Sequence, residues 1–160
     1  KIIDAGNGNE MDAAFREGVG QYIHQQGPAP QQLAADGVGH VVAELGPTIG
    51  SCGFSSLAAT PAWLATDTAK AFTRAYIKTR NYMNDASASE IAKAEKPLFP
   101  NIDLEVLTDC IATYQAMGCW TRHIDITQDG YDAMLNIFEY DGKLPQRYSY
   151  DQVCTLPPTV

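Results

Sequence analysis

The chain has 160 residues, enough for one ordinary domain or for two small ones. Apolar residues make up 45% of it, which excludes a disordered chain, and no apolar run is long enough to cross a membrane. Eleven Lys and Arg stand against 19 Asp and Glu, a formal net charge of −8. Because an acidic surface repels phosphate backbones, we expect no nucleic-acid partner.

The first third of the chain alternates segments typical of strands with segments typical of short helices. Strands are expected at residues 1–5, 21–25, 38–45 and 52–60, and helices at residues 9–17 and 31–35. We expect Asn9 to cap the first of these helices. Strands and helices that alternate at this spacing predict βαβ units, a small and mainly parallel sheet, and hence an α/β fold.

Beyond residue 60 the pattern becomes helical. Pro61 suits the first turn of a helix that we expect to run to about Asn84. Shorter helices are expected at residues 87–96, 103–117 and 128–140, the last capped by Thr127. Most aromatic side chains of this region recur at helical spacing, which predicts a core position for them. The predicted sheet is too small to cover all the apolar helix faces, so we expect some partner surface to be missing.

The cysteines and histidines of the chain show no pattern of a metal or catalytic site. No CxxC pair and no His at ligand spacing accompany the cysteines, so we expect no metal. The even number of cysteines permits a disulfide from Cys119 to Cys110 or to Cys154, and buried free thiols are an equal alternative. No serine lies in a GxSxG elbow, and nothing assembles a nucleophile, a base and an orienting group. We therefore predict a protein that is not an enzyme and uses no cofactor. The four cysteines are Cys52, Cys110, Cys119 and Cys154.

Candidate ligand-binding residues lie where the first two predicted strands end. The turn at residues 6–9 leads into a helix, so backbone N–H groups and the positive end of the helix dipole converge on it, which suits an anionic or strongly polar ligand. The side-chain amides at the end of the second strand can orient a solute by hydrogen bonds. The alternatives are a plain turn with an Asn cap and a scaffold role for the glutamines. The predicted ligand-binding residues are Asn7, Gly8, Asn9, Gln25 and Gln26.

Nearly the whole chain resembles the second half of ABC-importer solute-binding proteins of the NMT1/THI5-like group, which are type II periplasmic binding proteins. The segments that carry the resemblance are GNEMDAAFREGVGQYIHQQGPAPQQL, GHVVAELG and FSSLAATPAWLATDTAKAFTRAYIKTRNYMND. The resemblance implies two α/β lobes that hold a solute in the cleft between them. Residues 1–53 would form the second lobe with a return crossing, and residues 54–160 would belong to the first lobe, whose N-terminal half is absent.

The function implied by this resemblance is delivery of a small polar or anionic solute, such as a sulfonate, nitrate or a pyrimidine, to the membrane subunits of an ABC importer. The expected location is periplasmic or extracytoplasmic. Another chain or a second copy would complete the first lobe. A thiamine-pyrimidine enzyme on the same fold is an alternative, although its cysteine cluster is not found here, and a sensory ligand-binding domain is another. The chain starts inside a strand-like run, without an initiator Met or export signal, so we expect a fragment or a processed product.

Overall fold

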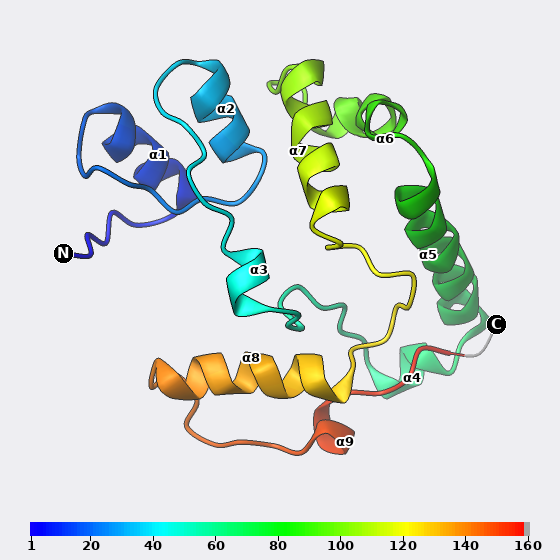
Figure 1. The fold of residues 1–160 in the computed structure, drawn as a ribbon. Coiled ribbons are helices and arrows are strands. Elements are labelled where there is room, and N and C mark those ends of the chain that lie inside the picture. The colour runs from blue at the N-terminus through cyan, green and yellow to red at the C-terminus, as the bar shows by residue number, and fades with distance from the viewer. Residues whose placement is uncertain (159–160) are drawn as a thin grey trace. The chain divides into compact units, whose positions relative to one another are not determined.

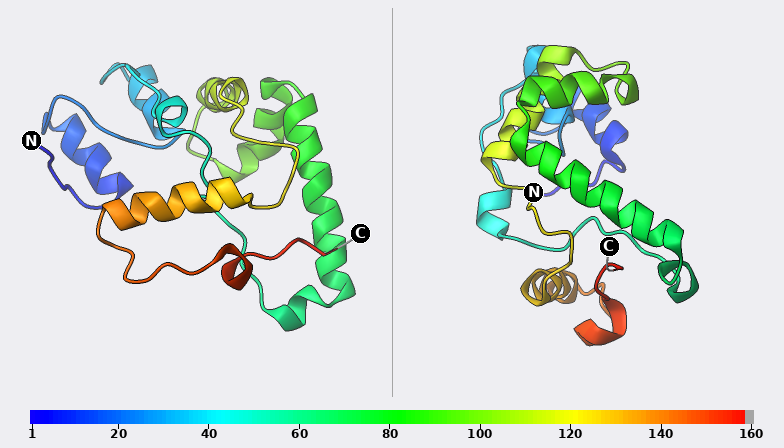
Figure 2. Two further views of the ribbon diagram at one scale, coloured as in Figure 1. Left: turned by 60° about the horizontal axis from the view of Figure 1, so that its bottom comes forward. Right: turned by 90° about the vertical axis from the view of Figure 1, so that its right-hand side faces the viewer.

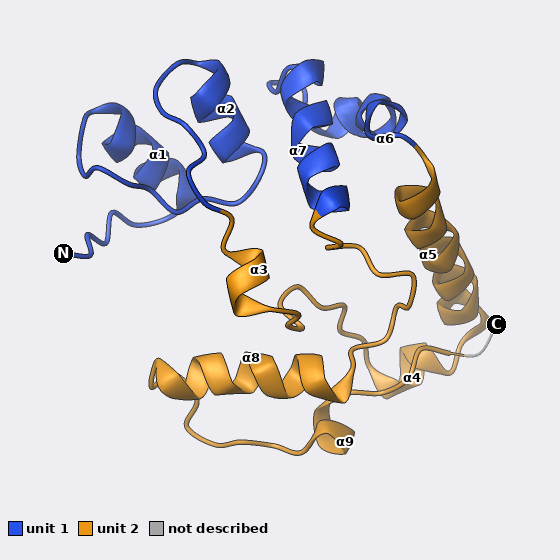
Figure 3. Ribbon diagram, in the orientation of Figure 1, with its two compact units in different colours: residues 1–43, 87–116 blue, residues 44–86, 117–160 orange. Residues whose placement is uncertain are grey.

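The computed structural model describes residues 1–158, and Figure 1 shows helices joined by turns and extended segments. Two compact units divide the chain, and each is made of two separate stretches (Figure 3). Unit 1 is Lys1–Ala43 with Ser87–Ala116, and unit 2 is Glu44–Ala86 with Met117–Val160. The expected boundary between two lobes, after residue 53, stays a prediction.

The predicted α/β fold is wrong for this structure, because no strand is assigned between residues 1 and 158. A strand forms only where a neighbouring strand pairs with its backbone N–H and C=O groups, and none of the expected segments has such a partner within residues 1–158. Their apolar side chains are consequently exposed: 96% for Ile2, 74% for Val42 and 65% for Leu57. Alternation of apolar residues indicates a strand, but it cannot supply the neighbouring strand that must pair with it.

Unit 1 is built around α7, Leu104–Ala116, which packs against α6, Ala88–Glu95, and against α2, Ala29–Ala35. In α7 the buried residues recur every three or four positions, so they form one apolar face of the helix. The first helix of the unit is α1, Gly8–Arg16. The buried side chains of this core are Leu33, Ile91, Ala92, Val106, Leu107, Cys110 and Ile111.

Polar contacts hold the smaller pieces of unit 1. The guanidinium of Arg16 bonds to Asp36 at the end of α2 over 2.8 Å and to Asp12 over 2.7 Å. Hydrogen bonds from Gln32 and Arg16 keep the pKa of Asp36 below its ordinary value. A 3₁₀ turn, η1, covers Lys96–Leu98, and the ammonium of Lys96 donates to the carbonyl oxygens that follow, the shortest being that of Ile102 at 2.6 Å. These bonds satisfy carbonyl groups between α6 and α7.

Unit 2 contains α3, Gly46–Ile49, α4, Pro61–Leu64, α5, Asp67–Asp85, α8, Gln128–Tyr140, and α9, Tyr150–Val153. The helix expected from Pro61 to Asn84 is interrupted after Leu64, because Thr66 adopts an extended conformation and its hydroxyl caps α5 through the amide of Ala69. The short α4 and the long α5 follow one another around this turn in each view (Figures 1 and 2).

The packing of unit 2 centres on α8. Tyr131 and Met134 are its buried side chains, and the amide of Gly53 donates to the carbonyl oxygen of Gly130 over 2.9 Å. The helix α9 packs beside α8, and the Tyr150 hydroxyl donates to the carbonyl oxygen of Ile126 over 2.5 Å. The Tyr150 contact ties α9, which follows the loop that leads out of α8, to the residues just before α8.

The predicted core position of the aromatic side chains is wrong for several of them. Phe72 is 45% exposed although it stacks on Tyr76, with ring centroids 6.1 Å apart, and meets the ring of Trp63 edge-on at 5.9 Å. Helical spacing placed these rings on one face, but a core also needs a second element over that face. Other exposed aromatic side chains are Tyr82, Phe138 and Tyr140.

Candidate functional site

The N-terminus of α1 closes on itself through a capping box. The Asn7 side chain accepts hydrogen bonds from the amides of Asn9 and Glu10, at 3.0 and 3.2 Å, and the Glu10 carboxylate accepts from the Asn7 amide at 2.7 Å. The helix therefore begins at Gly8 and its cap is Asn7, not Asn9 as expected from the sequence. The box satisfies amides that an anionic ligand would otherwise use.

The loop that ends at Gln25 reaches this same helix terminus. The Nε2 group of Gln25 donates to the carbonyl oxygen of Gly8 over 2.7 Å. A Cβ atom at Gly8 would lie 3.5 Å from Oε1 of Gln25, which is an ordinary van der Waals contact. The close approach of Gln25 to α1 therefore does not require a glycine at position 8. Two of the predicted loops therefore do meet in unit 1.

A residue of α7 contacts the loop that contains Gln25. The amide of Gly27 donates to the Tyr114 hydroxyl over 2.9 Å. A Cβ atom at Gly27 would lie 2.5 Å from the sulfur of Cys110 and 2.9 Å from the Tyr114 hydroxyl, so only glycine fits this approach. Gly27 and Tyr114 thereby fix the position from which Gln25 reaches α1.

The predicted ligand-binding residues differ in exposure. Asn7, Gly8 and Asn9 are exposed, Gln25 is half-buried and Gln26 is exposed. The carbonyl oxygen of Gln26 accepts from the amide that begins α2, so its main chain serves the turn. The assignment of these five residues to a ligand-binding site stays a prediction.

Two residues that shape the site were missed by the sequence reasoning. Glu10 could have been found, because an Asn followed three residues later by Glu before a helix is the pattern of a capping box. Tyr114 could not, because it lies 87 residues from its partner Gly27 and only the packing of α7 brings the two together.

The charge at the α1 terminus bears on the kind of ligand that fits. The Glu10 carboxylate lies beside the Asn7 amide and places a negative charge where the helix dipole is positive. An anionic ligand would meet this carboxylate, whereas a neutral ligand with hydrogen-bonding groups would not. The side chains of Asn9 and Gln26, both exposed, offer amide donors and acceptors for such a ligand.

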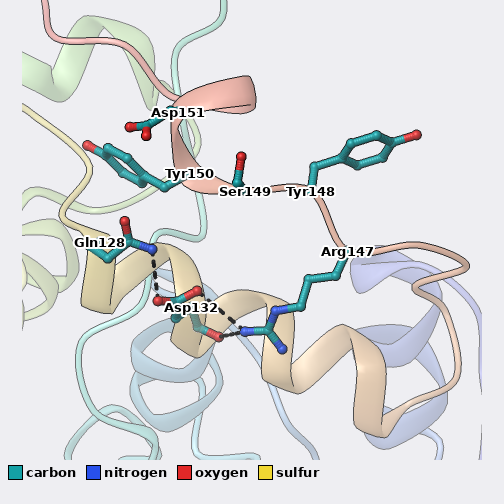
Figure 4. A pocket seen from close by; sticks show the side chains of 7 residues that line it. All are labelled: Gln128, Asp132, Arg147, Tyr148, Ser149, Tyr150 and Asp151. Carbon is teal, nitrogen blue, oxygen red and sulfur yellow. Dashed lines mark hydrogen bonds and ion pairs between the residues drawn. The ribbon is translucent and has the colours of Figure 1, made fainter.

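A hollow of about 370 Å³ lies on unit 2 between α8 and the loop before α9 (Figure 4). The Arg147 guanidinium projects across it onto one face of α8, where it bonds to Asn136 and Glu139 at 2.8 Å each and to Asp132 at 3.4 Å. Since Arg147 is already engaged by two carboxylates, it offers little to an anion. We interpret this contact as a clamp between the loop and the helix.

The metal and thiol chemistry of the described residues is limited. Between residues 1 and 158 no three His, Cys, Asp or Glu side chains lie close enough to hold a metal ion. The four cysteines are free, so neither of the disulfides considered from the sequence is formed. Burial raises the pKa of the Cys110 thiol to about 11, with added effect from Asp109 and Glu95, which makes this thiol a poor nucleophile. Among the helices that the structure describes, none combines the length and the apolar character of a membrane span.

Comparison with known proteins gives one informative likeness. The chain is 27% identical over 142 residues to "Putative binding protein YtlA" of Bacillus subtilis (strain 168). The match covers 88% of this chain and 42% of that protein, so the chain spans less than half the length of its relative. No family model matches the chain, and no solved structure matches it. A likeness to a protein named for binding agrees with the expectation of a role that is not catalytic.

Proposed function

We propose that the chain is part of an extracytoplasmic solute-binding protein that delivers a small polar solute to an ABC importer. The observation that carries this proposal is the likeness, over 88% of the chain, to a protein named as a binding protein. The three segments that resemble the NMT1/THI5-like group add the importer and the solute classes. In this role the functional act is binding and release, and ligand contacts stabilise the transport-competent state.

The proposed solute site is the place in unit 1 where α1 and the Gln25 loop meet. Its support is the 2.7 Å hydrogen bond from Gln25 to Gly8, which brings two predicted loops together. Exposed amide side chains beside this bond supply donors and acceptors of the kind that orient a small solute. The residues proposed to contact the solute are Asn7, Gly8, Asn9, Gln25 and Gln26.

Among the solutes of the resembling group, the geometry favours a neutral, hydrogen-bonding molecule such as a pyrimidine over nitrate or a sulfonate. The reason is the Glu10 carboxylate, which accepts from the Asn7 amide and repels an anion at this end of α1. Replacing this carboxylate by an amide in Glu10→Gln removes the repulsion while keeping an oxygen that can accept the Asn7 hydrogen bond.

The test is a thermal-shift and calorimetry panel of pyrimidines, nitrate, alkylsulfonates and taurine on the full-length protein of which this chain is proposed to be part. We expect a pyrimidine to raise Tm in a concentration-dependent way, because a ligand that binds only the folded state stabilises it. Asn9→Ala should weaken this binding about 10-fold, the effect of one lost hydrogen bond of about 1.4 kcal/mol. Asn101→Ala, at an exposed asparagine outside the site, is the matched control.

The outcomes of this panel separate the proposal from its rivals. No shift with any member of the panel would overturn the proposed function. Conversion of a pyrimidine into a product, detected by mass spectrometry, would establish an enzyme instead. A shift with sulfonates or nitrate that Glu10→Gln enhances would keep the binding role and change the solute class. Fractionation of the native host, with immunoblotting of the extracytoplasmic fraction, tests the proposed location.

A further inference from the structure

Polar contacts join α1 to the rest of unit 1 at both ends of the helix. None of the residues of α1 is buried, so the apolar core of the unit does not hold it. At the first turn, Nε2 of Gln25 donates to the carbonyl oxygen of Gly8 over 2.7 Å. At the last turn, the Arg16 guanidinium donates to Oδ2 of Asp36, the residue that follows α2, over 2.8 Å. These two contacts lie about 12 Å apart along the helix, so together they determine its direction.

An apolar contact supports the second of these attachments. A Cβ atom at Gly39 would lie 3.3 Å from Cε1 of Phe15, so the Phe15 ring lies directly on the backbone of Gly39. This ring contact brings the last turn of α1 beside the residues that follow α2. Apolar contacts are not directional, whereas a hydrogen bond between charged groups is. The bond from Arg16 to Asp36 therefore has the geometry needed to fix the orientation of α1.

The carboxylate of Asp36 is itself held in place on α2. Its Oδ1 atom accepts a hydrogen bond of 2.8 Å from Nε2 of Gln32, one turn earlier in the same helix. The other oxygen, Oδ2, is the one that accepts from Arg16. The guanidinium thus meets an acceptor whose direction α2 already sets.

We propose that the ion pair between Arg16 and Asp36 positions α1, and with it Asn7 and Asn9, for the solute. This inference rests on the proposed solute site. Arg16 lies seven residues after Asn9, about 10 Å along the same helix, so it acts through the position of α1 and not by touching the solute. A site that adopts its binding arrangement only part of the time binds more weakly in proportion to that fraction.

The experiment measures calorimetric Kd values on the full-length protein, with the pyrimidine that gives the largest thermal shift in the panel. Asp36→Asn should raise the Kd about 3-fold with little change in Tm, because an ion pair with both side chains about one-third exposed contributes little to global stability. Asp12→Asn is the matched control. Asp12 bonds to the same guanidinium over 2.7 Å, but it lies within α1, so its loss leaves the attachment to α2 intact and the Kd unchanged.

Two further measurements test whether the effect belongs to the pair. Arg16→Gln should raise the Kd as Asp36→Asn does, and combining the two substitutions should add nothing, because the pair is already broken. Added NaCl should narrow the difference in Kd between the parent and Asp36→Asn, since salt screens an exposed ion pair and the contacts of a neutral solute depend little on salt. A general loss of folding would produce neither result.

Hydrogen exchange without solute tests the position of α1 independently of the proposed function. Asp36 lies outside α1, so faster exchange at residues 8–16 in Asp36→Asn reports the loss of the attachment to α2. Equal Kd values for the parent and Asp36→Asn would overturn the inference and leave the proposed function standing. Equal rises in Kd for Asp12→Asn and Asp36→Asn would overturn it as well. If the parent bound no member of the panel, the proposed function would fail, and unchanged exchange at residues 8–16 would then overturn the positioning of α1 too.

Discussion

The Nε2 group of Gln25 donates a hydrogen bond of 2.7 Å to the carbonyl oxygen of Gly8 at the first turn of α1. The two residues lie 17 positions apart, so the bond joins two loops that the sequence presents separately. It defines the proposed solute site in unit 1, and it can be tested by substitution.

Gln25→Ala should lower the free energy of unfolding by about 1 kcal/mol, the net contribution of one hydrogen bond. It should also weaken solute binding, because the loop is no longer held at α1. Urea denaturation followed by circular dichroism measures the first effect, and calorimetry the second. Gln26→Ala is the matched variant, since Gln26 is exposed, and its stability should stay within about 0.5 kcal/mol of the parent. If Gln25→Ala and Gln26→Ala lowered the free energy of unfolding equally, the stabilising role of the Gln25–Gly8 hydrogen bond would be contradicted.

Gly27→Ala should destabilise the protein by about 1 to 3 kcal/mol, because the added methyl group meets the Cys110 sulfur at 2.5 Å. Removing that sulfur in the double variant Gly27→Ala with Cys110→Ala should recover part of the loss relative to Cys110→Ala alone. Gly46→Ala is the control, since its Cβ would lie 3.8 Å from the nearest atom, a sulfur of Met117. Additive effects of the Gly27 and Cys110 substitutions would show that the predicted clash is absent.

Cys110 should react with iodoacetamide at pH 8 about 100-fold more slowly than in the unfolded chain, because burial raises its thiol pKa from 9.0 to about 11 and only the thiolate reacts. Mass spectrometry of peptides from folded and urea-unfolded protein measures the two rates. Equal rates in the two states would contradict the buried position. Cys119, which is exposed, should differ far less between folded and unfolded protein.

The same pKa predicts how the stability contributed by Cys110 depends on pH. The folded protein keeps the proton up to about pH 11, whereas the unfolded chain loses it near pH 9. The contribution is therefore fully present below pH 9 and is lost as the pH rises through 11. The stability difference between the parent and Cys110→Val should shift by about 2 kcal/mol in favour of the variant from pH 8 to pH 11. A difference that does not change with pH would be inconsistent with the raised pKa.

Arg147→Ala should cost about 1 kcal/mol, because three side chains of α8 lose their shared partner while all of them stay accessible to water. Arg147→Lys should recover only part of this, since an ammonium lacks the planar fork of a guanidinium. Arg122→Ala is the comparison, because the guanidinium of Arg122 forms an ion pair with one exposed carboxylate, that of Asp85. Thermal denaturation measures all three variants, and a larger loss for Arg122→Ala would contradict the clamp.

Local patterns predicted the helices of this protein well where their ends are set by nearby residues. Thr127 was expected to cap a helix at residues 128–140, and the structure has α8 at Gln128–Tyr140 with Thr127 as its cap. Asn9 was the wrong choice of cap for α1, because the reciprocal bonds of Asn7 and Glu10 set the cap two residues earlier. The break at Thr66 was missed, although a Thr before an acidic first turn is a local signal.

Most of the longer helices and the cap of α8 could be predicted from the sequence, because they depend on hydrogen bonds between residues three or four positions apart, whereas the short helices α3 and α9 were not expected. Contacts between distant residues leave the expected strands unpaired, bring Gln25 to Gly8, and place Tyr114 against Gly27. Strand pairing and side-chain packing join residues far apart in the chain. The alternation of apolar residues does not specify which distant residues will contact them.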